Sequence, residues 1–385
     1  MSTAAATARQ MLERTGEHPV ISVYLDLDPS RFATAPARAT EVRSLIDEAE
    51  RDGRLDKDAL SHSDRSALSA DLERLDAYLG SDEPPVSGAR ALAVFCSGQD
   101  DLFEAIPLGG VVAPRVVIAL TPLIEPLVTG PDEGRVAVVL ISHRSGRILL
   151  GNLRELEEAE DVSDDVHGRT ARGGLSQHNY ERSIEADVQH HLRHVAEELY
   201  RSWQQERFSR LVLGGTAQDV EQFAAELPND LRPALAEGRL DVNVEEASLA
   251  QVRDALAPVL DRARAAAKES TLTELEDRLG ATSRAARGIE DTREALNERR
   301  VETLLLAHNF AAEGVRCPRC GLLYPAGTAH CPADGEATRP VADLREAAVE
   351  AAVLQDAGVL VFGEGSDPAP PALQHGGGIA ALLRF

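Results

Sequence analysis

A short segment in the middle of the chain combines residue types that suit chemistry on a crowded partner. Residues 172–177 read Arg-Gly-Gly-Leu-Ser-Gln. Two adjacent glycines permit backbone angles that are closed to other residues and let the main chain approach a partner closely. Gln177 supplies a neutral amide that can hydrogen-bond a water molecule or a leaving hydroxyl, while backbone N–H groups steady developing negative charge. Such residues could position a water molecule close to a crowded partner.

Cationic residues flank this segment. Arg169, Arg172 and Arg182 lie close to it in the sequence and could hold phosphate groups of an RNA. His178 directly follows the glutamine, and we expect it to contact RNA rather than to act as a general base. The segment and its neighbours therefore predict an RNA-binding surface built from arginine and histidine.

A structural interpretation of the same residues competes with the functional one. Gly173 and Gly174 could simply turn the chain, and Ser176 could cap the helix that follows. Short glycine motifs recur by accident, so the spacing alone does not decide between the two interpretations.

Three of the four cysteines, with one aspartate, form a pattern typical of a metal site. Two residues separate Cys317 from Cys320, two also separate Cys331 from Asp334, and a glycine follows each pair. Such turns are typical of zinc knuckles, and a carboxylate is a legitimate zinc ligand. We therefore predict a structural zinc site with Asp334 as the fourth ligand. His330 is the competing ligand, and a degenerate knuckle without metal is the alternative.

Apolar periodicity predicts alternating strands and helices along the whole chain, which is typical of an α/β protein with mixed sheets flanked by helices. Turn-rich breaks divide it into three domains, residues 1–130, 131–272 and 273–385. In the first domain we expect strands at 20–28, 91–96 and 111–120, and helices at 37–52 and 63–79.

The second domain must position the glycine–glutamine segment. A hairpin at 134–153 and an acidic stretch at 155–165 precede the segment, and a long helix at about 179–203 follows it. Further expected elements are strands at 210–214 and 241–244, and helices at 218–226 and 249–268. In the third domain we expect helices at 292–299 and 341–355, strands at 301–306, 358–362 and 379–385, and the zinc-knuckle insertion at 317–335.

Composition limits the classes of function. The net charge of −24 argues against RNA binding by general electrostatic attraction, so any RNA contact must be local and based on arginine. No apolar run is long enough to span a membrane, and the first residues lack the apolar stretch of a signal peptide. Crowded cysteines suit a reducing compartment, so we expect a cytoplasmic protein.

Two parts of the sequence resemble the archaeal and eukaryotic class-one release factors, Pelota, and their bacterial relatives. Residues 172–182 resemble the loop of the relatives that hydrolyse peptidyl-tRNA in ribosome quality control, with Leu175 and Ser176 inserted relative to Gly-Gly-Gln. Residues 284–308 and 376–385 resemble the opening and the closing strand of that family's third domain.

The resemblance implies a three-domain, release-factor-like architecture with an RNase H-like second domain. It also implies action on peptidyl-tRNA at the ribosome, with a translational GTPase as a further partner. The stop-codon elements Asn-Ile-Lys-Ser and Tyr-x-Cys-x-x-x-Phe are missing from residues 1–130, so codon-independent rescue or quality control is expected. A non-catalytic factor of the same fold, binding or hibernating the ribosomal A site, is the alternative.

Overall fold

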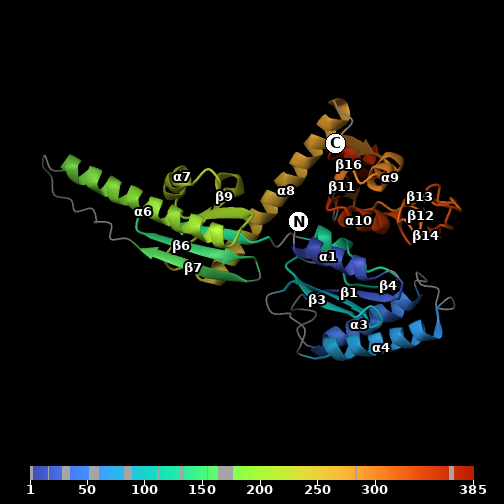
Figure 1. Ribbon diagram of the computed structural model, residues 1–385. Helices are drawn as coiled ribbons and strands as arrows, with labels where there is room; N and C mark the ends of the chain where they lie inside the picture. The colour runs from blue at the N-terminus through green and yellow to red at the C-terminus, as the bar shows by residue number, and fades with distance from the viewer. Residues whose placement is uncertain are drawn as a thin grey trace. The chain divides into compact units, whose positions relative to one another are not determined.

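The chain forms two compact units, here called unit 1 and unit 2. Unit 1 comprises residues 1–132 and 268–385, and unit 2 comprises residues 133–267 (Figure 1). The computed structural model describes residues 3–15, 17–27, 35–51, 60–81, 89–110, 112–130, 134–153, 155–163, 177–281, 284–363 and 368–385.

Unit 2 is built on one mixed sheet in the order β7-β6-β5-β8-β9. The central strand β5 pairs antiparallel with β6 and parallel with β8, and β8 pairs parallel with β9. The strands are β5 (Val136–Ile141), β6 (Ser145–Gly151), β7 (Leu156–Ser163), β8 (Arg210–Gly214) and β9 (Leu235–Leu240). The helices are α6 (Gln177–Gln205), α7 (Ala217–Glu226), the 3₁₀ turn η1 (Arg232–Ala234) and α8 (Leu249–Ala281).

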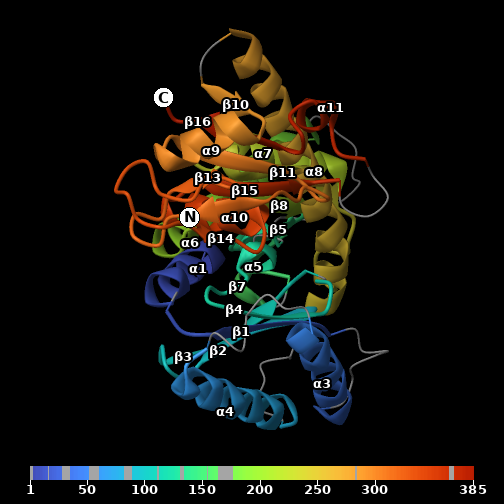
Figure 2. The same ribbon diagram turned by 90° about the vertical axis from the view of Figure 1, so that its right-hand side faces the viewer.

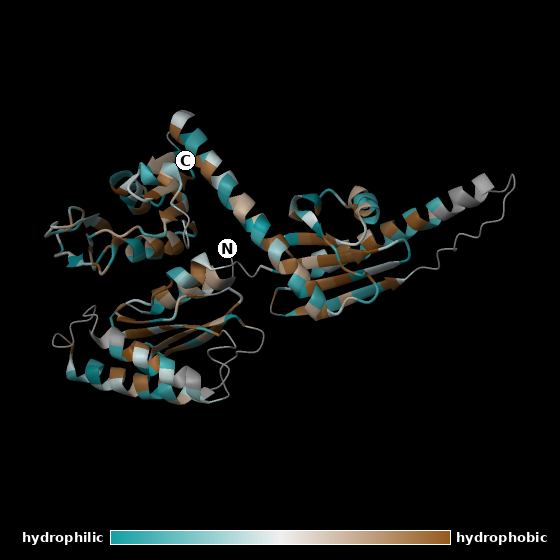
Figure 3. Ribbon diagram, turned by 180° about the vertical axis from the view of Figure 1, so that it is seen from behind, coloured by the Kyte–Doolittle hydropathy of each residue, from teal (hydrophilic) through white to brown (hydrophobic). Residues whose placement is uncertain are grey.

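Both faces of the unit 2 sheet are covered, which explains why every residue of β5 is apolar and buried. Alternate residues of a strand point to opposite faces. Ala137, Val139 and Ile141 pack with α6 and α7, whereas Val136 and Val138 pack with the first part of α8. Figure 3 shows these strands as largely hydrophobic ribbons between helices of mixed character.

One prediction in this unit needs correction. The strand expected at 241–244 is wrong, because β9 ends at Leu240. Beyond it the Asn243 side chain accepts hydrogen bonds from the N–H groups of Glu245 and Glu246, which forms a turn. The acidic stretch at 155–165 contains the edge strand β7, whose residues between Leu156 and Val162 are all exposed. Charged residues along an open edge discourage pairing with other chains.

Unit 1 contains an antiparallel sheet in the order β3-β2-β1-β4 near the N-terminus. In Figure 2, α3 and α4 lie on one side of it and α1 and α5 on the other. We did not expect α1 or β3; β3 contains Pro107, which an edge strand tolerates. The elements are α1 (Thr3–Arg14), β1 (Val20–Asp26), α3 (Ala35–Arg51), α4 (His62–Leu79), β2 (Ala91–Ser97), β3 (Leu102–Leu108), β4 (Arg115–Ala119) and α5 (Glu125–Thr129).

The C-terminal part of unit 1 has a second mixed sheet, in the order β10-β16-β11-β15, and a small sheet in the order β13-β12-β14. Its helix α10 begins at Leu344, after the N-cap Asp343, three residues later than the predicted start at 341. The elements are β10 (Ala285–Arg287), α9 (Ile289–Asn297), β11 (Val301–Ala307), β12 (Gly314–Arg316), β13 (Leu323–Pro325), β14 (Arg339–Pro340), α10 (Leu344–Leu354), β15 (Gly358–Phe362), α11 (Pro371–Gln374) and β16 (Ile379–Leu383).

One apolar core and a buried ion pair join the N-terminal and C-terminal parts of unit 1. Arg345 of α10 donates two hydrogen bonds of 2.6 Å to the carboxylate of Glu125 in α5, and a third to the carbonyl of Ala307. Ala8 and Met11 of α1 belong to the same core as residues of α10 and β15. The α/β class with several mixed sheets is confirmed. The division into three domains stays a prediction, and this packing places residues of the first and third of them in one compact unit.

Gly215 provides a test of the close packing at the end of β8. Its φ of +136° is closed to other residues, and an added Cβ would lie 2.3 Å from the carbonyl oxygen of Ile141. We expect Gly215→Ala to lower the free energy of unfolding of unit 2 by about 2–4 kcal/mol. Urea unfolding followed by the fluorescence of Trp203, the only tryptophan of the chain, measures this change.

Gly238→Ala is the matched control, because Gly238 also has a positive φ, +95°, but an added Cβ would meet only the flexible end of Arg262. This variant should carry backbone strain alone, about 1–2 kcal/mol. Equal losses for the two variants would contradict the close approach of Gly215 to β5.

Candidate functional site

The structure places the predicted glycine–glutamine segment immediately before α6. Gln177 is the first residue of that helix, two residues earlier than expected, and His178 and Arg182 lie in its first two turns. For these three the structure describes the backbone only. The start of α6 agrees with both interpretations of the segment. Five predicted site residues lie outside the described part of the chain: Arg169, Arg172, Gly173, Gly174 and Ser176.

Strand register shows where this segment joins unit 2. The carboxyl ends of β5, β8 and β9 lie together, since these strands are parallel neighbours. The β5–β6 turn lies at the same place, and Ser163, the last residue of β7, pairs with Ser145 beside it. We call this side of the sheet the carboxyl edge. The chain therefore leaves the sheet at the carboxyl edge and returns as α6.

Helix α6 extends well past the carboxyl edge. Val195 packs directly over Gly146, close to the β5–β6 turn, and leaves no room for a side chain there, since an added Cβ would lie 2.5 Å from it. Gln177 lies eighteen residues before Val195 in the same helix. At 1.5 Å per residue this separation is about 27 Å along the helix axis. Figure 1 shows the N-terminal part of α6 projecting beyond β6 and β7.

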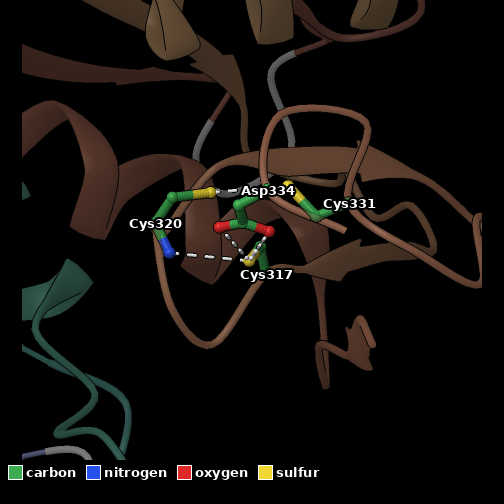
Figure 4. Close-up of side chains that lie close together, drawn as sticks. All are labelled: Cys317, Cys320, Cys331 and Asp334. Atoms are coloured by element: carbon green, nitrogen blue, oxygen red, sulfur yellow. Dashed lines mark hydrogen bonds between the residues drawn. The ribbon is translucent and has the colours of Figure 1, made fainter. Parts of the chain in front are cut away.

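The structure brings together all four residues predicted to bind metal. One ligand atom from each of Cys317, Cys320, Cys331 and Asp334 lies within 4.8 Å of the others (Figure 4). The sulfurs of Cys320 and Cys331 are 3.6 Å apart, and the sulfur of Cys317 is 3.4 Å from an oxygen of Asp334. Tetrahedral zinc would separate two sulfurs by about 3.8 Å and a sulfur from an oxygen by about 3.5 Å. The cluster therefore has the dimensions of a four-coordinate metal site.

The two halves of the cluster are turns with the same backbone hydrogen bonds. In residues 317–322 and in residues 331–336, the first N–H donates to the sixth carbonyl and the fifth N–H donates to the first carbonyl. The fifth residues, Gly321 and Gly335, have φ of 76° and 75°. Asp334 therefore occupies the position in the second turn that a cysteine occupies in the first.

His330, the competing ligand, is exposed and forms a backbone bridge with Ala337. The ligand group found among the described residues contains Asp334 and omits His330. Cys96, far from the cluster in sequence, is buried in β2 and lies 3.4 Å from an oxygen of Asp71, in agreement with its interpretation as a core thiol.

Electrostatics favours charged ligands at two of the four positions. The N–H of Glu336, together with the neighbouring thiols, lowers the pKa of Asp334 to about 2. Burial alone would raise the pKa of Cys331, but hydrogen bonds from the Tyr324 hydroxyl and from nearby backbone N–H groups lower it overall. The same contact, with oxygen and sulfur 3.3 Å apart, raises the pKa of Tyr324 to about 12.

Sequence analysis did not identify Tyr324 as part of the site. Its position between the two turns is the only signal in the sequence, and it becomes informative only once pairing of β12 with β13 brings the hydroxyl to Cys331. A hydroxyl that donates to a ligating thiolate orients it and tunes its basicity, as outer contacts of metal ligands generally do.

A known family model matches the part of the chain that forms unit 2. Residues 122–268 match the family model described as bacterial archaeo-eukaryotic release factor family 10. The resemblance to relatives of the release factors is confirmed. The matched residues include all five strands of the unit 2 sheet and α6, and therefore the frame that carries Gln177.

Individual proteins are similar to this chain over most of its length. Peptide chain release factor subunit 1 of Thermococcus onnurineus is 23% identical over 356 residues, covering 84% of this chain and 86% of that protein. The crystal structure of an archaeal translation termination factor covers 99% of this chain and 97% of its own, at 19% identity and a TM-score of 0.28. Archaeoglobus fulgidus Pelota covers 77% and 79%, at 17% identity and a TM-score of 0.35.

None of the helices in the described part of the chain is long and apolar enough to cross a membrane.

Proposed function

We propose that this protein is a ribosome-associated peptidyl-tRNA hydrolase that releases a nascent peptide through Gln177. The observation that carries the proposal is the position of Gln177 at the start of α6, about 27 Å along the helix from the edge of the sheet. A projecting helix can carry a short glycine-rich segment into a narrow site while the body of the protein stays outside. The match of residues 122–268 to a release-factor family supports the same assignment.

The proposed chemistry requires few catalytic groups from the protein. The ester between peptide and tRNA is already activated by the ribosome, so the protein has to admit and orient one water molecule. The Gln177 amide would hydrogen-bond that water or the leaving hydroxyl, and backbone N–H groups of Gly173, Gly174 and Ser176 would steady the developing charge. His178 has no proton-transfer role in this scheme.

RNA contacts in this proposal are local. Arg169, Arg172, His178 and Arg182 would bind phosphates of tRNA or ribosomal RNA around the segment. An overall charge of −24 then serves to limit non-specific binding to nucleic acid. The partners are the ribosome, peptidyl-tRNA and a translational GTPase, and the expected setting is codon-independent rescue or quality control in the cytoplasm.

Removing the amide gives the most direct test of catalysis. We expect Gln177→Ala to slow peptide release from ribosomes carrying peptidyl-tRNA by at least about 100-fold, because one oriented hydrogen-bonding group is lost. Single-turnover release of labelled peptide at saturating protein measures the rate, and sedimentation with ribosomes measures binding, which should persist.

Gln205→Ala is the matched control, because Gln205 is an exposed glutamine at the other end of the same helix. Its release rate should equal that of the wild type. Ribosome binding without release by the wild type would refute the hydrolase and leave the non-catalytic A-site factor. Equal release by wild type and Gln177→Ala would show that another group acts on the ester.

The second part of the proposal concerns the metal cluster. We propose that Cys317, Cys320, Cys331 and Asp334 hold a structural Zn²⁺, since their donor set and separations fit tetrahedral coordination. The ion would join the two turns and fix the small sheet of β12, β13 and β14. Thiolate ligands must lose their protons to bind, so zinc affinity should fall as the pH is lowered.

Zinc content discriminates between the two possible fourth ligands. We expect Asp334→Ala to weaken zinc binding by at least about 100-fold, and Asp334→Cys to retain zinc, because a thiolate at the same turn position completes the site. Elemental analysis and competition with a chelator measure both. His330→Ala should match the wild type; loss of zinc from that variant, with retention in Asp334→Ala, would reverse the assignment.

A further inference from the structure

The turn between β5 and β6 carries an imidazole that a buried carboxylate holds in place. His143 lies in this turn, and its Nδ1 is 2.6 Å from Oδ1 of Asp219 in α7. The Asp219 side chain is only 4% exposed, whereas that of His143 is 49% exposed. The pair therefore joins a fixed, shielded anion to an imidazole that solvent and partners can reach.

Asp219 is held on both of its oxygens. Its Oδ2 accepts a hydrogen bond of 2.7 Å from the hydroxyl of Thr216, the N-cap of α7, and its own N–H donates to that hydroxyl. The bond from the Asp219 N–H to the Thr216 hydroxyl is an N-cap, which holds the first turn of the helix. With Oδ2 used in this way, Oδ1 remains to hold the ring of His143.

The backbone of the turn is fixed as well. The hydroxyl of Ser142 accepts hydrogen bonds from the N–H groups of Arg144 and Ser145, at 3.3 and 3.1 Å. Arg144 is exposed, and among the described residues its guanidinium forms no ion pair. Two adjacent side chains, one imidazole and one guanidinium, thus project from a turn whose geometry is set in advance. Side chains held in this way suit a binding site, because a binding site requires groups fixed in advance.

The place of this turn links it to the glycine–glutamine segment. His143 and Arg144 lie at the carboxyl edge, where the pairing of Ser145 with Ser163 puts the last described residue before that segment beside them. Because Gln177 begins about 27 Å away along α6, the turn is too distant to act on the bond that Gln177 would hydrolyse. It is well placed to contact the body of an RNA whose end the segment reaches.

We propose that His143 and Arg144 form a binding site for a backbone phosphate of RNA, with Asp219 as the residue that orients the imidazole. Asp219 accepts the Nδ1–H and so turns Nε2 outward. An imidazolium formed on binding would donate Nε2–H to the phosphate, and Arg144 would add its planar donors. The site rests on the proposed function for its location at the ribosome. The proposed phosphate contact depends on Asp219, which lies far from His143 and Arg144 in the sequence.

Ribosome binding at several salt concentrations tests the site. Each phosphate contact adds close to one unit to the slope of log affinity against log salt. We expect His143→Gln and Arg144→Gln each to weaken binding about five- to tenfold and to lower the slope by about one. Arg144→Lys should keep the slope. Asp219→Asn should weaken binding in the wild type, but add little in the His143→Gln background.

Arg201→Gln is the matched control, since Arg201 is an exposed cation near the far end of α6 and lies away from the carboxyl edge. Its affinity and slope should equal those of the wild type. Trp203 fluorescence shows whether each variant of unit 2 is folded. Vacant ribosomes and ribosomes carrying peptidyl-tRNA are compared. Weaker binding of His143→Gln and Arg144→Gln to both kinds assigns the phosphate to ribosomal RNA, and weaker binding only to the loaded ribosomes assigns it to tRNA.

Unchanged affinity and slope in both His143→Gln and Arg144→Gln would overturn the site, as would weaker binding at an unchanged slope. The proposed hydrolase fails by a different measurement, the release rate of Gln177→Ala. A folded wild-type protein with no affinity for either kind of ribosome would overturn both.

Discussion

The parallel pairing of β5 with β8 is the constraint on which the arrangement of unit 2 depends. Parallel neighbours cannot be joined by a tight turn, so the chain must return from the carboxyl edge to the opposite end of the sheet before β8 begins. The hairpin partners β6 and β7 come first, and the crossing is then made by α6. A crossing element of 29 residues is far longer than a five-residue strand requires. The excess projects past the carboxyl edge and carries Gln177.

Charged side chains are unevenly distributed over unit 2. The edge strand β7 carries acidic side chains, and Glu158 forms a bidentate ion pair with Arg147 of β6. The exposed side chains of His143 and Arg144 lie in the β5–β6 turn instead, close to where the chain leaves the sheet before the glycine–glutamine segment. An acidic protein can bind RNA if its cations are concentrated where contact occurs, because ionic screening confines each charge to about 8–10 Å. For RNA binding, the local position of the cations therefore matters more than the net charge of the protein.

Much of the candidate site could be predicted because the relevant spacing is local. The cysteine turns, the hairpin and the helix after the segment are all set by residues a few positions apart. Two strands were missed or misplaced for local reasons: β3 was obscured by Pro107, and β9 was placed too late because Asn243 turns the chain. Pairs such as Glu125 with Arg345, 220 residues apart, leave no trace in local periodicity.

Few apolar side chains are buried beside the cluster of Cys317, Cys320, Cys331 and Asp334. The core cluster beside it contains only three buried side chains, Leu323, Leu344 and Ala347, and two of these belong to α10. So small a core cannot order two turns and three short strands by itself, and segments of this kind are usually fixed by a metal or by disulfides. The identical hydrogen bonding of the two turns sets the four ligand positions. A metal would then stabilise a geometry that the backbone already favours, with Asp334 as one of its ligands.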